Sequence, residues 1–339
     1  MKIPEISVVI PMYNTEKYIG ECLESILAQT FQDFEVIVVN NCSTDNSCAV
    51  VKNFSDNRIK LAHTKKNFGY PSLPRNFGLE ISRGKYIFFM DSDDILIKNS
   101  LEIMFTYAEK FQADVVNCTA SYQFDESDKN KKHISKMLDI EQPVFMSENL
   151  SERLNAWFRG IFFSPPLYKF SRRDFLVYNE IKFDKITRED DLWTLKLVCL
   201  AKKYLMIPEI CYIKRNNRGD NITTKKRTVN EYVNYWFGRS VRSFKILDEF
   251  TAEIEFFQKN PEIRYMVLNS WLSGDLSIAL GACAESNLSL NTIYEMFQTE
   301  FKEYFGENNA FISALITNNI TNMFNLMIAN QEIMKLKAK

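Results

Sequence analysis

Short runs of β-branched and aromatic residues alternate with segments of helical periodicity over the first hundred residues, and this alternation restricts the fold most. The predicted strands cover residues 6–10, 36–39, 59–62 and 86–90. After the first strand, which we expect to stop at Pro11, a helical apolar face follows with Ile19, Cys22, Leu23, Ile26 and Leu27. This order is typical of βαβ units around a mostly parallel sheet, so we predict an α/β fold.

The rest of the chain divides into a mixed part and a helical part. Further helices are predicted at residues 76–82, 100–112 and 188–202, further strands at 115–118, 167–170, 205–207 and 212–215, and a charged loop at 123–136. Beyond residues 225–227 the pattern becomes helical, with segments at 232–247, 251–258, 264–282, 290–304 and 311–335. We therefore predict a catalytic α/β domain at 1–225 and an α-helical domain at 226–339.

Charge and cysteine content exclude several classes of protein. The formal net charge is −1, yet residues 159–227 carry 16 Lys and Arg against 8 Asp and Glu, between two acidic flanks. Acidic flanks would repel a long polyanion, so no nucleic-acid partner is expected. Seven cysteines without a CxxC pair and two histidines predict neither a disulfide framework nor a zinc site. With no leader pattern and no apolar run of about 18 residues, we expect a cytoplasmic protein.

Three polar clusters follow predicted strands: residues 11–14, 40–43 and 91–94. Ligands of open parallel sheets bind at the carboxyl ends of the strands, so these clusters are expected around one crevice. The alternative is that each cluster is only a turn, because Pro, Asn, Ser and Asp are turn formers.

The cluster Asp91-Ser92-Asp93-Asp94 comes directly after an apolar strand. Carboxylates that are crowded together repel one another unless they share a cation or face water. Hard oxygen ligands suit Mg²⁺ or Mn²⁺, which typically bind one or two carboxylates together with substrate phosphates. We therefore interpret this cluster as a site for a phosphate-bridging metal ion.

Three stretches together resemble glycosyltransferase family 2. They read SVVIPMYNTEKYIGECLESILAQTFQDFEVIVVNNCSTDNS, then PRNFGLEISRGKYIFFMDSDD, then REDDLW, and the resemblance covers residues 4–220. It implies a GT-A fold and an inverting enzyme, of the hexosyl- or N-acetylhexosaminyltransferase class, that uses a nucleotide-sugar donor.

The resemblance also implies a donor site. Asp93 would hold Mn²⁺ or Mg²⁺ on the donor diphosphate, Asp91 would lie by the ribose or the metal, and Pro11 to Tyr13 would form a wall of the nucleoside pocket. Arg75 would approach the nucleotide, and Arg215 and Arg218 would contact phosphates. The full predicted set for the nucleotide sugar is Pro11, Tyr13, Asn14, Asn41, Asn67, Arg75, Asp91, Ser92, Asp93, Arg215 and Arg218.

The family's catalytic base is matched by Asp190 in the pair Glu189-Asp190, and Asp191 is the rival for that role. The reaction needs a group that takes the proton of the attacking hydroxyl. Read from the residues alone, the same three acids also suit a helix amino terminus, where the macrodipole favours negative charge.

One position departs from the family. Asn41 stands where the family has an Asp that accepts from uracil. An amide can accept that hydrogen bond, but it can also donate to cytosine. The family resemblance still favours UDP as the donor nucleotide, and CDP and GDP are the alternatives to test.

Several partners and rival functions stay open at this point. The implied acceptor is a hydroxyl of a cell-surface glycan such as a capsule or lipooligosaccharide, either free or lipid-linked. The carboxyl-terminal helices could pack internally, form a homodimer or touch a membrane surface peripherally. The rival functions are a haloacid-dehalogenase-like phosphatase, suggested by FFMDSDDIL, and a non-catalytic scaffold that binds sugar nucleotides.

Overall fold

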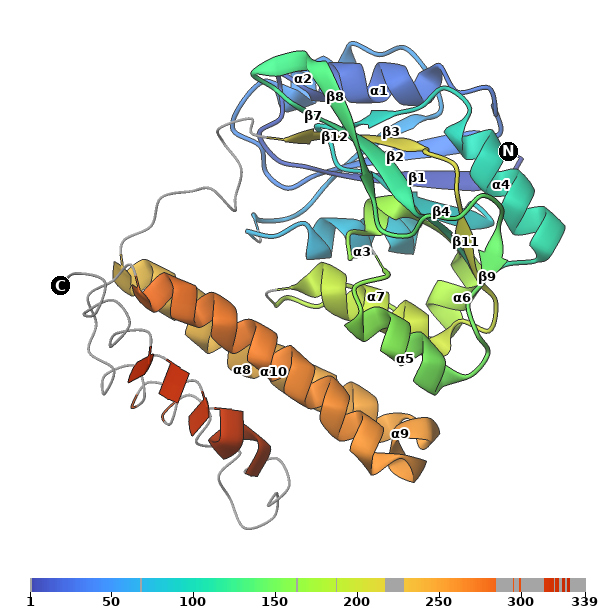
Figure 1. The fold of residues 1–339 in the computed structure, drawn as a ribbon. Coiled ribbons are helices and arrows are strands. Elements are labelled where there is room, and N and C mark those ends of the chain that lie inside the picture. Colours follow the sequence, from blue (N-terminus) through green and yellow to red (C-terminus); the bar gives the residue numbers. More distant parts are fainter. Residues whose placement is uncertain are drawn as a thin grey trace. The chain divides into compact units, whose positions relative to one another are not determined.

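The computed structural model describes residues 2–67, 69–162, 164–186, 188–216, 229–284 and 314–319, together with positions 295, 299, 321–322, 325–326 and 328–329. The chain forms two compact units (Figure 1). The amino-terminal unit extends to Thr224 except for Ile186–Arg188, and the carboxyl-terminal unit comprises Ile186–Arg188 and Lys225 onward. Residues 217–228, where Arg218 was placed in the donor site, lie outside the described residues.

An eight-stranded sheet forms the centre of the amino-terminal unit, in the order β3-β2-β1-β4-β10-β6-β11-β9. Its strands are β1 (Ile6–Met12), β2 (Phe34–Asn40), β3 (Ile59–His63), β4 (Tyr86–Phe89), β6 (Val115–Cys118), β9 (Val144–Phe145), β10 (Lys169–Arg172) and β11 (Tyr204–Ile207). The strands β1 to β4 run parallel, whereas β10 lies antiparallel between β4 and β6. The predicted α/β fold with a mostly parallel sheet is therefore confirmed.

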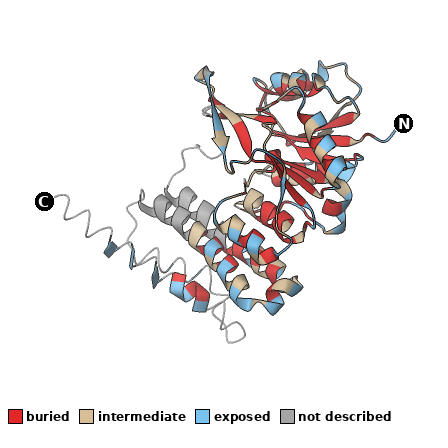
Figure 2. Ribbon diagram, turned by 45° about the vertical axis from the view of Figure 1, so that its right-hand side comes forward, coloured by how far each residue is buried: buried red, intermediate tan, exposed pale blue. Residues whose placement is uncertain are grey.

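Helices cover both faces of this sheet (Figures 1 and 2). They are α1 (Ile19–Leu27), α2 (Ser47–Lys52), α3 (Ser72–Ile81), α4 (Ser100–Phe111), α5 (Leu150–Phe158), α6 (Arg173–Tyr178) and α7 (Glu189–Leu200), with a 3₁₀ turn at Pro166–Tyr168. Because side chains alternate along a strand, Val8 packs with α1 and α4 on one face, whereas Val9 packs with α3, α6 and α7 on the other.

The first strand was predicted to end at Ile10, before Pro11, but it continues for two more residues, to Met12. Pro11 pairs with Val39 of β2, and β4 is paired with β1 only as far as Val9. The Val9 carbonyl accepts from Met90, so the side of Pro11 that lacks an N–H group faces β4, which has already ended. A proline is tolerated in this strand because no ladder hydrogen bond is lost.

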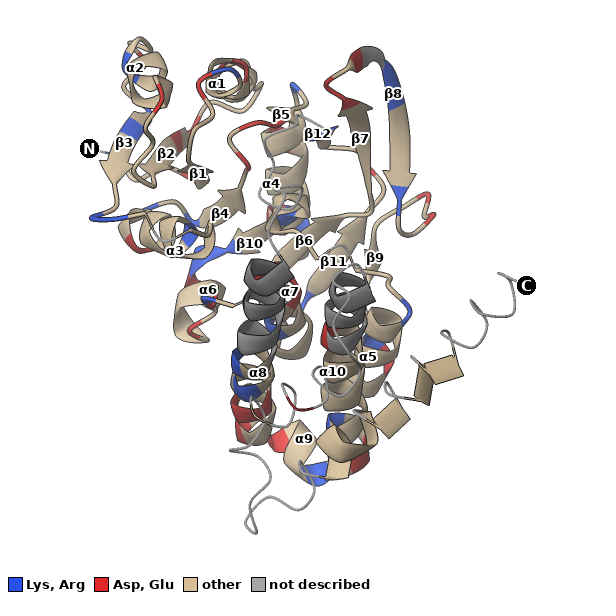
Figure 3. Cartoon of the chain, turned by 90° about the vertical axis from the view of Figure 1, so that its left-hand side faces the viewer, with Lys and Arg blue, Asp and Glu red and all other residues tan. Residues whose placement is uncertain are grey.

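Residues 123–136 were expected to form a loop, and this prediction is wrong. They belong to the hairpin β7 (Ala120–Asp125) and β8 (Asp128–Lys136). The hairpin joins β5 (Ile95–Leu96) and β12 (Tyr212–Asn216) in a second sheet of order β5-β12-β7-β8. The strand β8 lies at the edge and carries exposed lysines, visible in Figure 3, so its composition resembles that of a loop.

The carboxyl-terminal unit contains α8 (Val229–Glu253), α9 (Glu255–Lys259) and α10 (Pro261–Ala284). Trp271 is fully buried and donates from Nε1 to Ser243 Oγ at 2.8 Å. The guanidinium of Arg188 lies 4.2 Å from the centre of the Trp271 ring and pairs with the buried Asp275 at 3.1 Å. No helix in the described part of the chain combines the length and apolar character that crossing a bilayer requires. The helix predicted at 290–304, and most of that at 311–335, lie outside the described residues.

Candidate functional site

The loops after β1 and β2 are joined by hydrogen bonds. The backbone N–H of Asn14 donates to Ser43 Oγ at 3.1 Å, and Asn14 Oδ1 accepts from the N–H of Thr44 at 2.8 Å. Asn14 and Cys42 adopt left-handed backbone angles, with φ of 51° and 59°, which tighten both turns. The first two polar clusters therefore lie together, as predicted, at the carboxyl ends of their strands.

The side chain of Asn41 is buried between two polar neighbours. Its Oδ1 accepts from Thr64 Oγ1 at 3.2 Å, and its Nδ2 donates to Asn67 Oδ1 at 3.2 Å. Asn67 also accepts from the N–H of Gly69 at 2.7 Å. The predicted nucleoside wall adds the buried Pro11 and the exposed ring of Tyr13, so polar edges and one aromatic face lie at these strand ends.

The acidic cluster after β4 is held by residues of β12. Tyr212 donates to Asp94 Oδ2 at 2.8 Å and accepts from the backbone N–H of Asp91 at 3.2 Å. The N–H of Arg215 donates to Asp94 Oδ1 at 2.7 Å. Burial, together with the charges of Asp93 and Asp91, raises the pKa of Asp94 well above its usual range. Asp94 and Ser92 are buried, whereas Asp91 and Asp93 are partly exposed.

Arg75 of α3 joins the acidic cluster to the start of α7. Its Nη2 lies 2.9 Å from Asp91 Oδ1, its Nη1 lies 2.9 Å from Asp190 Oδ1, and Glu189 is 3.8 Å away. Burial disfavours the charge of this arginine, but the three carboxylates outweigh burial and raise its pKa. Two segments that are 99 residues apart in sequence, at Asp91 and Asp190, are thus brought together by one buried guanidinium.

The height of α3 above the sheet is set by Gly78. A Cβ atom at this position would lie 2.2 Å from Val9 Cγ1 of β1, a distance that atoms cannot adopt. Only glycine therefore allows this close approach of the helix to the strand. Because Arg75 lies one turn earlier on α3, the same contact fixes where its guanidinium emerges.

Glu189 and Asp190, at the start of α7, differ in the charges that surround them. Burial, followed by the charge of Asp190, raises the pKa of Glu189 to about 8. Burial also raises the pKa of Asp190, whereas Arg75 and Lys169 act in the opposite direction. At neutral pH Glu189 is therefore largely protonated, while Asp190 has two cations that favour its ionised form.

Arg215, predicted to contact phosphates, is a buried residue bonded to other parts of the protein. Its side chain is 4% exposed, between the rings of Tyr18 and Phe124. The guanidinium donates to Glu21 Oε2 at 2.6 Å, to Glu126 and to the carbonyl oxygen of Asp93 at 2.8 Å. These bonds tie α1 and the β7–β8 turn to the acidic cluster.

Tyr212 and Asp94 are the supporting residues that sequence reasoning missed. Tyr212 was predicted only as part of a strand, and Asp94 only as a neighbour of the DxD pair. Both are buried and bonded to one another. The signal that could have found them is the third acid, Asp94, beside a DxD pair that already supplies two ligands, because a buried carboxylate needs a hydrogen-bond donor.

Among the described residues, no group of three His, Cys, Asp or Glu side chains is arranged to enclose a metal ion. Asp91 and Asp93 fit a different type of site, because two partly exposed carboxylates can bind Mg²⁺ or Mn²⁺ when substrate phosphates complete the coordination. Asp94 is a weaker candidate, because it is buried and its two oxygens accept hydrogen bonds from Tyr212 and from the N–H of Arg215.

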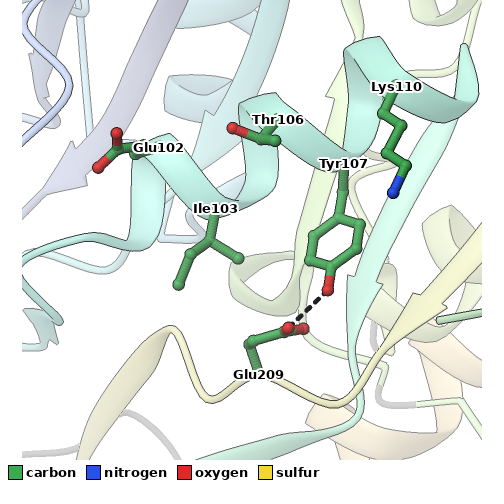
Figure 4. A pocket seen from close by; sticks show the side chains of 6 residues that line it. All are labelled: Glu102, Ile103, Thr106, Tyr107, Lys110 and Glu209. Carbon is green, nitrogen blue, oxygen red and sulfur yellow. Dashed lines mark hydrogen bonds between the residues drawn. The ribbon is translucent and has the colours of Figure 1, made fainter. Parts of the chain in front are cut away.

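A separate hollow of about 430 Å³ lies beside α4 (Figure 4). It is lined by Glu102, Ile103, Thr106, Tyr107, Lys110 and Glu209. Tyr107 donates to Glu209 Oε1 at 2.6 Å across it. None of the predicted site residues borders this hollow, and the strand ends therefore stay the candidate site.

Comparison with known proteins defines the class first. The solved structure of S. aureus TarS 1-349 in complex with UDP superposes with a TM-score of 0.67 at 19% identity, covering 97% of this chain and 91% of that one. A mannosyltransferase from Pyrobaculum calidifontis, solved with GDP-Man and Mn²⁺, gives a TM-score of 0.51 at 15% identity, covering 96% of this chain and 87% of that one. The molecule has the GT-A fold of glycosyltransferases.

The family follows from the sequence. Residues 7–177 match the family described as "Glycosyl transferase family 2", and the chain belongs to that family. Glycosyltransferase GlyG of Streptococcus pneumoniae serotype 4 is 34% identical over 225 residues, which are 65% of this chain and 73% of GlyG. TarP of Staphylococcus aureus, a poly(ribitol-phosphate) beta-N-acetylglucosaminyltransferase, is 26% identical over 237 residues, 67% of this chain and 68% of TarP. The protein is a glycosyltransferase, and the phosphatase and scaffold alternatives are not favoured.

Proposed function

We propose that this enzyme transfers a sugar, with inversion, from a nucleotide diphosphate to a hydroxyl of a cell-surface glycan. The observation that carries the proposal is the Arg75 bridge, which holds Asp91 and Asp190 within 2.9 Å of the same guanidinium. A donor-binding acid and a base must flank the reacting carbon, and this bridge brings the two candidates into one cluster. A glycan acceptor is supported by the name of TarP.

Asp190 is the proposed general base. The acceptor oxygen attacks C1 of the donor sugar, the bond from C1 to the diphosphate oxygen breaks, and its electron pair leaves with the diphosphate. The acceptor proton passes to the Asp190 carboxylate. Glu189 is a weaker candidate because its pKa of about 8 leaves it protonated at neutral pH. Attack on the face opposite the leaving group inverts the anomeric centre.

Asp93 and Asp91 are the residues that would hold Mn²⁺ or Mg²⁺. When bound, such an ion supplies positive charge for the departing diphosphate. Arg215 contributes indirectly, because its bond to the Asp93 carbonyl at 2.8 Å fixes the backbone of this segment. Asp94 does the same through Tyr212, at 2.8 Å.

UDP is the proposed donor nucleotide. Asn41 is buried at the predicted base-binding position, and its amide carries both an acceptor and a donor. Its Oδ1 accepts from Thr64 Oγ1, and an amide oxygen is also the type of acceptor that the uracil N3–H needs. Competition among free UDP, GDP and CDP in a binding assay tests this step, and clear preference for CDP or GDP contradicts it.

The transfer itself is tested with a panel of nucleotide sugars in the presence of Mn²⁺, by following slow release of the nucleotide without acceptor. UDP-N-acetylglucosamine is the first donor to try, given the activity in the name of TarP. Release from one donor that disappears in Asp93→Ala supports the proposal. Full activity of Asp93→Ala, or release from no donor of the panel, contradicts it.

A further inference from the structure

Lys169 is a fully buried lysine at the functional edge of the large sheet. It is the first residue of β10, with a relative exposure of 0%. Because β10 runs antiparallel to β4, with Phe170 opposite Phe88, its first residue lies at the end of the sheet where β4 leads into Asp91. A lysine side chain is rarely buried completely unless its ammonium group is paired or hydrogen-bonded.

The ammonium group of Lys169 is bonded to a turn that α7 also contacts. Its Nζ donates to the carbonyl oxygen of Pro165 at 3.0 Å and to that of Ser164 at 3.4 Å. The Ser164 carbonyl also accepts from Thr194 Oγ1 at 2.6 Å. Thr194 is buried on α7, one turn after Asp190. One carbonyl group thus connects Lys169 to the helix that carries the proposed base.

The charged groups around this lysine are those of the proposed base. Asp190 and Asp191 of α7 interact electrostatically with Lys169, as does the thiol of Cys118 on β6. Burial lowers the pKa of Lys169 to about 7, against the attraction of the two carboxylates. The lysine is therefore charged over the acidic range in which a carboxylate base must stay ionised.

Asp190 faces opposing charges on several elements. Burial and the carboxylates of Asp91 and Asp191 oppose its ionised form, whereas Arg75 of α3 and Lys169 of β10 favour it. Glu189, its neighbour on α7, is coupled to the same arginine. Arg75 also pairs with Asp91, whereas Lys169 donates to the 164–165 turn and interacts electrostatically with Asp190 and Asp191 of α7.

We propose that Lys169 is a positioning residue for transfer: its ammonium group anchors the 164–165 turn to which α7 is bonded, and it supplies positive charge beside Asp190. This role rests on the proposed function of Asp190 as the base. It also accounts for a charged side chain at a fully buried strand position, where a methionine of similar length would avoid the cost of removing a charge from water.

Lys169→Met, Lys169→Arg and Thr194→Val test the proposal. The readout is the pH profile of kcat for UDP release from UDP-N-acetylglucosamine with Mn²⁺. In Lys169→Met the acid limb should move up by about one pH unit, because an opposite charge nearby lowers a carboxyl pKa by roughly that amount or more. Its kcat should fall about 10-fold at pH values below the midpoint of the wild-type acid limb and less on the plateau above it, with the donor KM nearly unchanged. Lys169→Arg should leave the acid limb in place.

Thr194→Val is the matched control, because it removes the other bond to the Ser164 carbonyl without changing charge. It should lower kcat by a similar factor at every pH and leave the acid limb unmoved. If the two single variants behave alike, Lys169 is only structural and the proposal fails. If Lys169→Met does not fold by circular dichroism, Lys169→Arg decides: an acid limb that moves by a full unit despite the retained charge overturns the proposal.

Asp190→Asn in the same assay separates this inference from the proposed function. Activity that survives in Asp190→Asn contradicts the base assignment on which the inference depends. An inactive Asp190→Asn with an unshifted Lys169→Met profile contradicts the role of Lys169 alone.

Discussion

Two arginines of the amino-terminal unit, Arg75 and Arg215, are both buried and both paired with carboxylates, but we infer different roles for them. Arg75 is 3% exposed and Arg215 is 4% exposed, and each is paired with two carboxylates at hydrogen-bond distance. The partners of Arg75 are Asp91 and Asp190, which belong to the acidic cluster and the proposed base. The partners of Arg215 belong to α1 and to the turn between β7 and β8. Burial and pairing do not distinguish the two arginines. The role of each is therefore inferred from the function of its carboxylate partners.

Among the substitutions around these arginines, Asp190→Asn should cause the largest loss of kcat. The asparagine keeps the size and one acceptor for Arg75 but cannot take up a proton. We expect kcat to fall about 10³-fold, within the range attributed to a general base, while UDP binding stays within about 3-fold. Steady-state kinetics and isothermal titration with UDP measure the two quantities. Asp191→Asn is the matched control, with an expected loss below about 10-fold, and a reversed order would move the base to Asp191.

Arg75→Met should be the next largest effect. It leaves Asp91 and Asp190 without the cation they share at 2.9 Å, so both the acidic cluster and α7 lose a fixed position. We expect kcat to fall about 10²-fold, as for loss of a residue that orients a reacting group. Arg75→Lys should lie between, because an ammonium group lacks the planar fork that reaches both carboxylates. Wild-type kcat in Arg75→Met, with a normal circular dichroism spectrum, would disprove the bridge as a functional feature.

Arg215→Met should lower the free energy of unfolding and leave kcat nearly unchanged. Breaking a buried ion pair by removing one partner costs roughly 3 kcal/mol or more, and we expect a loss of that size in urea unfolding. At 20 °C, where the variant is still folded, kcat and UDP affinity should stay within about 5-fold of wild type. Glu21→Gln is the milder control at a half-exposed partner, with a loss of about 1 kcal/mol. Strongly weakened UDP binding at normal stability would return Arg215 to the phosphate contacts.

The sequence alone predicts some elements of the fold correctly and misses others. The apolar runs of the sheet and the face of α1 are read correctly because burial on one or both faces leaves a periodic signal, as in Ile19, Cys22, Leu23 and Ile26. The hairpin β7–β8 is missed because an edge strand needs no apolar side chains on its outer face, and its lysines imitate a loop. Pairing partners determine such a strand, and pairing is not local in sequence.

The candidate site divides in the same way. Polar residues directly after apolar strands point to Asn14, Asn41 and Asp91 because the topology of a parallel sheet gathers strand ends at one edge. The roles of Arg215 and Lys169 could not be read, because the sequence shows a charge but not which carboxylates the fold will bring to it. Lys169 is hidden within a run that reads as an ordinary strand, and only its complete burial distinguishes it.

The smallest expected effect concerns the third carboxylate near Arg75. The pKa of Glu189 is raised to about 8 in the folded protein from an ordinary value of 4.5, mainly by burial. The folded state therefore binds this proton more tightly than the unfolded state, and the free energy of unfolding falls as the pH rises from about 4.5 to about 8. Glu189→Gln stays neutral throughout, and its free energy of unfolding relative to wild type should rise by about 2 kcal/mol between pH 6 and pH 8. Urea unfolding at several pH values measures the difference, with Glu24→Gln, at an exposed position of α1, as the control. A constant difference between wild type and Glu189→Gln would mean that Arg75 keeps Glu189 ionised, and the bridge would then hold three charged carboxylates where we infer two.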